Sequence, residues 1–339
     1  MIDLIEAGDP PAKNAGVFGL SSQIQDSRIV LIPVNWDATA SYGYGTSKAP
    51  QKILEASHQL DLFDPFYGEP YKMGITMIDE LKDMDHLNEK ARQLVQERRE
   101  LLPSFNDKIK EKCLKVNQLS ERVNSWVEET SQYYLDQGKI VGVVGGDHSS
   151  PYGLIKSLSK KYDSFAVLHI DAHFDLRKSY EGFEYSHASI MYNVLTKIPQ
   201  VKKICQIGIR DFSKGEYRYN ENLKERSRTF FDRQLARNKV LCKPFFETIK
   251  EIIRFLPERI YVSFDVDGLD PKLCPSTGTP VPGGLDFSEV QVLFEELSLS
   301  GKKIIGFDLC EVNPRENIEY DQNVGARVLY KLCSLSLGR

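Results

Sequence analysis

Three short segments of the sequence combine aspartate and histidine at spacings that suit metal binding. Each begins where an apolar run ends: GGDHSS (145–150), LHIDAHFD (168–175) and SFDVDGLDP (263–271). Side chains two residues apart in an extended chain point to the same side, so we expect Asp171, His173 and Asp175 to share one face. Asp265 and Asp267 repeat this spacing in the third segment. The pattern predicts a cluster of metal ligands.

Together with His148, this set comprises four carboxylates and two imidazoles. Buried carboxylates without counter-charge repel one another, and their pKa values rise. Two divalent cations would neutralise them, provided that some carboxylates bridge both ions. Oxygen and nitrogen donors without a thiolate favour Mn²⁺, or Ni²⁺, over a structural Zn²⁺. His169 is expected to point to the opposite side or into the core, so we leave it out of the set.

The elements that position these residues are predicted by short, β-rich apolar runs. Six runs have this character: Arg28–Val34, Lys139–Val144, Ser164–Ile170, Lys203–Arg210, Arg259–Phe264 and Lys302–Leu309. Their continuous hydrophobicity indicates strands buried on both faces, as in a parallel sheet. Helical patterns lie between them, for example at Pro151–Tyr162 and Phe287–Leu297. We therefore predict an α/β domain with helices on both faces and functional side chains at the carboxyl ends of the strands.

One segment interrupts this alternation of strands and helices. Residues 81–134 are strongly charged and patterned like two helices, with a break near LLPSFND (101–107). We expect a helical excursion packed on the edge of the sheet, although a role in binding a partner is an alternative. Its apolar residues do not form a heptad array. With no linker or internal repeat, the prediction is a single domain spanning residues 1–339.

The overall composition limits the classes of partner and the compartment. The 339 residues include 44 Lys and Arg against 48 Asp and Glu, and the net charge of −4 provides no bulk attraction to nucleic acid or to anionic membranes. The N-terminal residues lack the features of a signal peptide, and no apolar run is long enough for a membrane helix. Six scattered cysteines favour a reducing compartment, and we expect a cytoplasmic protein.

At these motifs the sequence resembles the ureohydrolase superfamily, which includes arginases, agmatinases, formimidoylglutamases, guanidinobutyrases and guanidine hydrolases. GGDHS, DAHFD and SFDVDGLDP are similar to its three signature blocks, and further similarity lies at residues 37–57, 277–285 and 308–314. The resemblance covers roughly residues 28–57 and 138–330, with the excursion outside it. It implies a three-layer α/β/α arginase-type fold around a parallel sheet of about eight strands, and homo-oligomers such as trimers or hexamers.

The resemblance also implies two Mn²⁺ ions, with Ni²⁺ as an alternative. One ion would be held by His148, Asp171, Asp175 and Asp265. The other would be held by Asp171, His173, Asp265 and Asp267. By this resemblance, a metal-bound hydroxide attacks the guanidinium carbon and releases urea and an amine.

Three side chains have catalytic roles by the same resemblance. Glu311 would pair with the substrate guanidinium, and His187 would shuttle protons to the departing amine or from bulk water. Asp175, besides binding metal, could take up the proton of the tetrahedral species. His187 and Glu311 are therefore both candidate substrate-binding residues.

Departures from the arginase pattern indicate the substrate only in part. Residues 176–186 lack the Asn-rich stretch of arginases, and Ser213 stands where arginases have Asp, while Glu216 is kept. Both changes weaken recognition of free arginine, because an unpaired buried ammonium is costly. An agmatinase-like activity is our first choice, with guanidine hydrolase close behind. Three aromatic residues of this stretch could wall off a small cation or simply pack the loop down: Tyr180, Phe183 and Tyr185.

Other activities and one different class of protein stay open at this stage. Arginase, guanidinobutyrase and formimidoylglutamase share the implied chemistry. An inactive metal-binding homologue with a regulatory or scaffolding role is the alternative from another class, and the intact ligands, Glu311 and His187 disfavour it. A deacetylase-like amide hydrolase of the same fold would lack ligands at His148 and Asp267, which this chain has.

Overall fold

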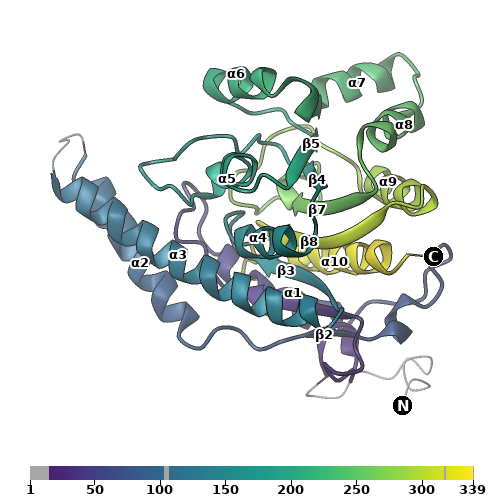
Figure 1. Ribbon diagram of the computed structural model, residues 1–339, viewed down its shortest axis with the longest axis horizontal. Helices are drawn as coiled ribbons and strands as arrows, with labels where there is room; N and C mark the ends of the chain where they lie inside the picture. The colour runs from purple at the N-terminus through teal and green to yellow at the C-terminus, as the bar shows by residue number, and fades with distance from the viewer. Residues whose placement is uncertain (1–14, 103–106, 317, 339) are drawn as a thin grey trace.

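An eight-stranded parallel sheet forms the middle layer of the structure (Figure 1). The structure is a computed structural model that describes residues 15–102, 107–316 and 318–338. The strands are β1 (Ile29–Val34), β2 (Ile75–Met77), β3 (Ile140–Gly145), β4 (Phe165–Ile170), β5 (Val201–Ile207), β6 (Ser227–Phe230), β7 (Arg259–Asp265) and β8 (Lys303–Cys310). They lie in the order β2-β1-β3-β8-β7-β4-β5-β6, and every neighbouring pair is parallel. The predicted α/β class is confirmed.

Helices cover both faces of this sheet. Within the described residues they are α1 (Ala49–Ser57), α2 (Met84–Glu100), α3 (Asp107–Asp136), α4 (Tyr152–Lys161), α5 (Ile190–Lys197), α6 (Lys214–Asn222), α7 (Asp232–Val240), α8 (Phe245–Phe255), α9 (Phe287–Leu299) and α10 (Tyr320–Leu337). Apolar residues of α1, α8, α9 and α10 pack in one cluster with one face of the sheet. Residues of α2, α3, α4 and α5 pack against the other face. The three-layer arrangement is therefore as predicted.

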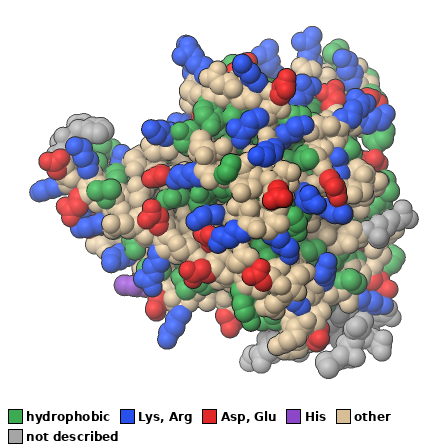
Figure 2. All heavy atoms as spheres, viewed as in Figure 1, with side chains coloured by type: hydrophobic (Ala, Val, Ile, Leu, Met, Phe, Trp, Pro, Cys, Tyr) green, Lys and Arg blue, Asp and Glu red, His purple; other side chains and the backbone are tan. Residues whose placement is uncertain are grey.

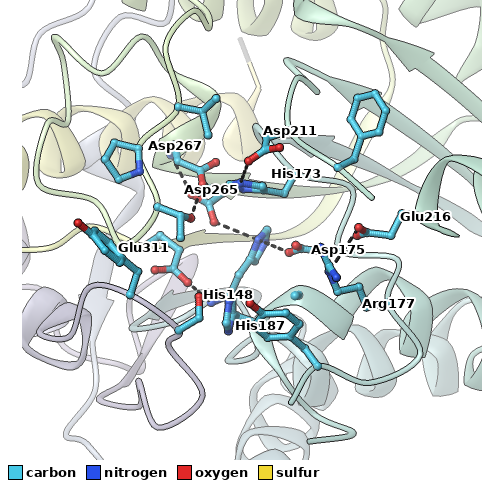
Figure 3. A pocket seen from close by; sticks show the side chains of 18 residues that line it. His148, His173, Asp175, Arg177, His187, Asp211, Glu216, Asp265, Asp267 and Glu311 are labelled. Carbon is cyan, nitrogen blue, oxygen red and sulfur yellow. Dashed lines mark hydrogen bonds and ion pairs between the residues drawn. The ribbon is translucent and has the colours of Figure 1, made fainter. Parts of the chain in front are cut away.

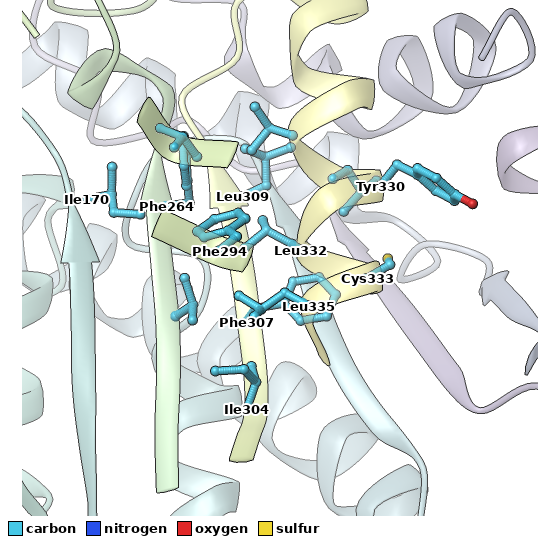
Figure 4. Packing of buried hydrophobic residues seen from close by; sticks show 14 of the residues in the cluster. Ile170, Phe264, Phe294, Ile304, Phe307, Leu309, Tyr330, Leu332, Cys333 and Leu335 are labelled. Atoms are coloured by element: carbon cyan, nitrogen blue, oxygen red, sulfur yellow. The ribbon is translucent and has the colours of Figure 1, made fainter. Parts of the chain in front are cut away.

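The core between the sheet and helices α1, α8, α9 and α10 explains in part why the strand sequences are continuously apolar. Phe264 of β7 and Phe307 of β8 pack with Phe294 of α9 and Leu332 of α10, and all four are fully buried (Figure 4). Strand residues that alternate with these belong to the opposite core, as Tyr261 does. A strand buried on both faces needs apolar side chains at successive positions.

The six strands predicted from apolar runs all form, and two further strands that these runs did not locate complete the sheet of about eight that the resemblance implied. β5 begins and ends earlier than expected, whereas the other five lie close to their predicted bounds. The unpredicted strands β2 and β6 are the two edges of the sheet. They contain three and four residues, and the sequence of β6 is SRTF. Such short, partly polar edge strands leave no continuous apolar signal.

The charged segment forms a helical hairpin of α2 and α3, as predicted, but its position differs from the prediction. Its base covers a face of the sheet, where Leu87 of α2 and Val127 of α3 pack with Ile32 and Val141 of the strands. The rest of the hairpin projects beyond the sheet (Figure 1). Residues 103–106 of the expected break lie outside the described residues.

The surface agrees with the nearly balanced charge of the sequence. Acidic and basic side chains are interspersed on the visible face, including along the projecting hairpin (Figure 2). All six cysteines are free, and Cys242 is the exposed one. Among the described residues, no helix has the length and apolar character needed to cross a bilayer.

The contact between α3 and α4 is tight enough to test the packing. An ideal Cβ on Gly153 would lie 2.4 Å from the Asn124 carbonyl oxygen and 2.6 Å from the Glu128 nitrogen. We expect Gly153→Ala to lower the free energy of unfolding by about 1–3 kcal/mol, because it forces two packed helices apart. Urea unfolding would measure the change. Gly215→Ala is the matched control, since the nearest atom to its Cβ is the Ser213 Oγ at 3.7 Å. Equal effects of the two substitutions would contradict this packing.

Candidate metal centre and pocket

The candidate site lies at the carboxyl ends of four neighbouring strands. β3, β8, β7 and β4 are adjacent in the sheet, and each is followed directly by residues of the site. His148 follows β3, Glu311 follows β8, and Asp265 is the last residue of β7. Asp171 and His173 follow β4. Parallel strands end at one edge, so the fold brings residues far apart in sequence into one place.

His148 is the centre of the first group of donors. Its Nδ1 lies 3.1 Å from Asp171 Oδ2, 3.2 Å from Asp175 Oδ2 and 3.3 Å from Asp265 Oδ2. The four side chains are buried. The four residues are those of the first ligand set implied by the sequence, and Figure 3 shows His148 with Asp175 and Asp265.

His173 is the centre of the second group. Its Nδ1 lies 3.0 Å from Asp267 Oδ2 and 3.5 Å from Asp171 Oδ1. Backbone groups hold the carboxylates: Asp267 Oδ1 accepts a hydrogen bond from the Ala172 N–H at 3.0 Å, and Asp265 Oδ1 accepts one from the Asp267 N–H at 2.8 Å. Asp171 therefore lies between the two groups, and all six predicted ligand residues come together.

The donor set fits two divalent cations. Ligand atoms of His148, Asp171 and Asp175 lie within 4.8 Å of one another, and so do those of Asp171, His173 and Asp267. The two groups share Asp171, as a bridging carboxylate requires. Four carboxylates with two imidazoles form an oxygen-rich set that suits hard or borderline divalent ions.

The pKa values of the clustered aspartates and histidines show that the cluster lacks positive charge when no cation is bound. Burial raises the pKa of Asp265 well above its usual value, and the neighbouring Asp267 and Asp171 add to the shift. Burial, together with the charge of Asp171, raises the pKa of Asp175 to about 6. The pKa of His148 is raised well above its usual value because the surrounding carboxylates outweigh its burial. In the metal-free protein, bound protons thus reduce the repulsion between the carboxylates, as bound cations would.

A second layer of side chains orients the candidate ligands. The Nε2 of His148 lies 2.9 Å from Ser263 Oγ and 3.6 Å from Asp308 Oδ1. Such contacts to the outer nitrogen of a ligating histidine fix its ring and its tautomer. His169 Nε2 lies 2.8 Å from Asp171 Oδ2.

His169 is fully buried, as one of the two expected positions requires, but the other expectation, that it points away from the cluster, was wrong. It lies in the same cluster as His148 and Asp171, and does not face away from them. The period of two that places Asp171, His173 and Asp175 on one face also includes residue 169, so the sequence signal was present. Sequence reasoning also missed Ser263 and Asp308, since their partners come from other strands.

Glu311 enters the site under a backbone constraint. Its φ is +65°, and Asp175 has a φ of +55°; both values lie in the left-handed region, which non-glycine residues adopt uncommonly and at some cost in backbone strain. The Glu311 Oε1 accepts a hydrogen bond from the His148 N–H at 3.0 Å. Burial and the charge of Asp147 raise the pKa of Glu311 well above its usual value. A bound cation beside this carboxyl group would favour its ionised form.

His187 is held at the pocket by the loop after β1. Its N–H donates to Thr39 Oγ1 at 3.2 Å, and Thr39 Oγ1 in turn donates to Asp147 Oδ2 at 2.8 Å. Burial lowers the pKa of His187 to about 3, with a contribution from the positive charges of His173 and His148. The imidazole is therefore neutral at physiological pH in the metal-free protein.

The cluster opens into a cavity of about 530 Å³. Its inner wall includes His148, His173, Asp265, Asp267 and Glu311. Tyr42, Tyr180, Arg177, Asp211 and Phe212 line it as well. A volume of this size lies in the range of roughly 300–1,000 Å³ that is typical of small-molecule sites.

Glu216 lies in the cavity wall but is fully engaged. Its Oε2 accepts hydrogen bonds from the Ser213 N–H at 3.0 Å and the Ser213 Oγ at 2.7 Å, and lies 3.3 Å from the Arg177 Nε. Its Oε1 accepts one from the Leu176 N–H at 3.3 Å. This carboxylate caps helix α6 and pairs with an arginine that sequence reasoning did not select, so its charge is already balanced.

The sequence left open whether the three aromatic residues of the 176–186 stretch line the cavity or pack the loop down, and the structure shows both. Phe183 is fully buried against the α2–α3 hairpin, so it packs the loop down. Tyr185 lies against Tyr152, with ring centroids 5.5 Å apart. Tyr180 alone of the three lines the cavity, 5.7 Å from the His187 ring and 5.0 Å from the Arg177 guanidinium.

The sequence of this chain matches a known protein family along most of its length. The family model described as Arginase family matches residues 27–334. An N(1)-aminopropylagmatine ureohydrolase of Thermus thermophilus is 29% identical over 319 residues, covering 93% of each chain. The agmatinase of Bacillus anthracis is 29% identical over 291 residues, covering 86% of this chain and 85% of the relative.

A solved structure shows the same fold. The agmatine ureohydrolase of Thermoplasma volcanium is 24% identical, with a TM-score of 0.72 over 99% of this chain and 97% of that chain. The family match runs through the α2–α3 hairpin, which the sequence resemblance had left out.

The protonated state of the cluster predicts how pH acts on the metal-free protein. Five groups have raised pKa values: Asp175, Asp265, Glu311, His148 and His173. The folded metal-free state therefore binds protons more tightly than the unfolded state, and its stability falls as pH rises through these values. The pKa values of His187 and Asp171 are lowered, so these two groups act in the opposite direction below their ordinary pKa values.

We therefore expect the melting temperature of EDTA-treated protein to fall by several degrees between pH 5 and pH 8. Added Mn²⁺ should raise the melting temperature more at pH 8 than at pH 5, because the cations then displace fewer protons. Differential scanning calorimetry at both pH values, with and without Mn²⁺, measures both effects. A metal-free protein that becomes more stable towards pH 8 would contradict this description of the cluster.

Proposed function

Because the chain belongs to the arginase family, we propose that it hydrolyses agmatine, or a similarly extended cationic guanidino compound, to urea and an amine. The names of the relatives agree with this reaction class, since they include agmatinases and N(1)-aminopropylagmatine ureohydrolases. The observation that carries the proposal is that Glu311 and the Asp–His cluster face one cavity.

We infer that two Mn²⁺ ions occupy the cluster. The proposed ligands of the first are His148, Asp171, Asp175 and Asp265, and those of the second are Asp171, His173, Asp265 and Asp267. The shared position of Asp171 and the predominance of carboxylates support Mn²⁺, with Ni²⁺ as the alternative. When bound, the two ions supply the Lewis acidity that makes water a nucleophile at neutral pH.

The chain's own groups then bind and orient the substrate. The Glu311 carboxylate would pair with the planar guanidinium through charge-assisted hydrogen bonds, which fixes the guanidinium carbon relative to the cluster. Its His148 N–H contact keeps this carboxylate aimed at the cavity. A guanidinium paired with the Glu311 carboxylate would offset the free-energy cost of burying its negative charge.

Asp175 and His187 are the proposed proton carriers. Asp175 lies in the cavity wall beside the cluster, where its carboxylate is the proposed acceptor of the proton released during hydrolysis. His187 lines the same cavity, where its imidazole is the proposed carrier of a proton between bulk water and the departing amine. Thr39 holds the backbone of His187, and Asp147 in turn holds Thr39.

The cavity wall supports a substrate with a distal ammonium group. Asp211 has a largely exposed carboxylate in this wall, with His173 Nε2 at 4.0 Å. The charges of Arg177 and Glu216 balance each other. A net negative charge therefore favours an ammonium over the carboxylate of a guanidino acid. The cavity also exceeds what guanidine needs, which favours an extended substrate over the guanidine hydrolase alternative.

We extend the proposal to the context in which the enzyme works. Six free cysteines, five of them buried, support a cytoplasmic location. One continuous sheet with a core on each face supports a single domain over residues 1–339. The family resemblance supports a homo-oligomer, a trimer or hexamer. The small guanidino substrate is the proposed partner, with no nucleic acid and no membrane.

The proposed function is tested by urea release from Mn²⁺- and Ni²⁺-loaded enzyme. The panel comprises agmatine, N(1)-aminopropylagmatine, arginine, 4-guanidinobutyrate, formimidoylglutamate and guanidine, with ammonia measured for the last two. We expect agmatine or its aminopropyl derivative to exceed the others in kcat/KM by at least about 100-fold. No product from any compound, with two metals bound per chain, would overturn the proposal and favour the inactive homologue.

Glu311→Gln tests the guanidinium contact. We expect the variant to keep its metal content but to lose about 100-fold or more in kcat/KM for agmatine, because the guanidinium loses its charged partner. Glu258→Gln is the control. This glutamate pairs with Lys303 and precedes β7, so it lies at the amino ends of the strands, opposite the site. An unchanged kcat/KM in Glu311→Gln would remove Glu311 from substrate binding.

Asp211→Asn tests the distal ammonium contact. We expect KM for agmatine to rise about tenfold, because a solvent-accessible ion pair is lost. The inhibition constant of butylguanidine, which lacks the ammonium, should not change. Asp163→Asn, an exposed aspartate before the start of β4, is the matched control. Equal weakening of agmatine and butylguanidine would exclude an ammonium partner role for Asp211.

A further inference from the structure

Two loops border the cavity and come from distant parts of the sequence. The first pocket loop, residues 37–45, contributes Tyr42, and the second pocket loop, residues 176–186, contributes Arg177 and Tyr180. The strands position the cluster, but these loops lie beyond the strand ends. Their relative position must therefore be fixed by other contacts.

The second pocket loop is anchored to the α2–α3 hairpin. Tyr180 and Phe183 exchange backbone hydrogen bonds around Glu181 and Gly182, whose φ values are +52° and +86°. This is a two-residue hairpin turn of the type I′ kind. Phe183 at its end is buried among Val95, Ile109, Cys113 and Val116 of the helices. The Glu184 N–H donates to Asn117 Oδ1 of α3 at 2.9 Å.

The first pocket loop is anchored to the same hairpin. Asp37 and Asn88 of α2 form a reciprocal pair, in which the Asp37 N–H donates to Asn88 Oδ1 at 3.0 Å and the Asn88 Nδ2 donates to Asp37 Oδ1 at 2.9 Å. The guanidinium of Arg92 lies over the ring of Tyr44, 4.4 Å from its centroid.

One side chain joins the two loops directly. The Arg99 Nε donates to Glu181 Oε2 of the second loop at 3.0 Å. Its Nη2 donates to the Ala40 carbonyl of the first loop at 3.0 Å, and its Nη1 donates to the Tyr44 hydroxyl of that loop. Ala40 and Glu181 are each one residue from the cavity wall, next to Ser41 and Tyr180. A planar guanidinium with donors in fixed directions is suited to this threefold contact, and an ammonium is not.

We propose that Arg99 is a positioning residue that sets the distance between the two pocket loops and thereby the affinity for the extended part of the substrate. The α2–α3 hairpin serves as the support that carries it. This inference deepens the proposed function and rests on it for the identity of the substrate. The metal cluster is placed by the strands, so the contact acts on substrate binding rather than on metal binding.

Kinetics of the metal-loaded enzyme test this proposal with a graded set of substitutions. Arg99→Ala removes all three contacts, Arg99→Lys keeps the charge without the fork, and Tyr44→Phe removes a single acceptor. Arg122→Ala, an exposed arginine on α3, is the matched control. We expect Arg99→Ala to raise KM for agmatine about tenfold with kcat within about threefold and two metals retained. Arg99→Lys should recover only part of the loss, and Tyr44→Phe should show a smaller one.

Hydrogen–deuterium exchange supplies a readout that does not depend on activity. In Arg99→Ala, amides of both pocket loops should exchange faster, while those of β3, β4 and β7 stay protected. An unchanged KM with unchanged loop exchange would overturn the proposal, and so would loss of metal with a parallel fall in kcat. If the unsubstituted enzyme hydrolyses no guanidino compound, the proposed function fails. The exchange of the two loops then still decides whether Arg99 holds them.

Discussion

The crowding of buried carboxylates at one edge of the sheet is the constraint on which the rest of the structure depends. Asp171, Asp175 and Asp265 approach a single nitrogen of His148 within 3.3 Å, and all four side chains are buried. Such a group cannot stay fully ionised without positive charge, and the raised pKa values of Asp175 and Asp265 express that burial and mutual repulsion. The fold tolerates the arrangement because cations can relieve it. A site of this kind is useful to an enzyme that must ionise water near neutral pH.

The parallel sheet positions the Asp–His cluster, and the α2–α3 hairpin positions the loops that border the cavity. Adjacent strand ends hold the cluster on rigid backbone, and outer contacts such as His169 to Asp171 orient the ligands. The substrate-facing loops, in contrast, depend on the α2–α3 hairpin, which receives Phe183 in its own small core. This separation allows the loops to vary with the substrate while the chemistry at the strand ends stays the same.

Local patterns were enough to predict the class of fold, six strands and the six candidate ligand residues that the structure brings together, because buried parallel strands and same-face spacing leave clear signals in the sequence. The edge strands β2 and β6 could not be predicted, since three or four partly polar residues give no such signal. His169 was misplaced although the period of two included it. Arg99, Ser263 and Asp308 acquire their roles only through partners far away in the sequence, as the Arg99 contact with Glu181 shows. Long-range contacts of this kind have no local pattern.

The central claim is that two divalent cations at the strand ends make this protein a guanidino hydrolase. The most direct measurement titrates metal-free protein with Mn²⁺, counts the bound ions by equilibrium dialysis and records urea release from agmatine on the same samples. The account predicts two ions per chain, with urea release reaching its maximum only as the second ion binds. Full activity without bound metal, or two bound ions without urea from agmatine or any related guanidino compound, would contradict it.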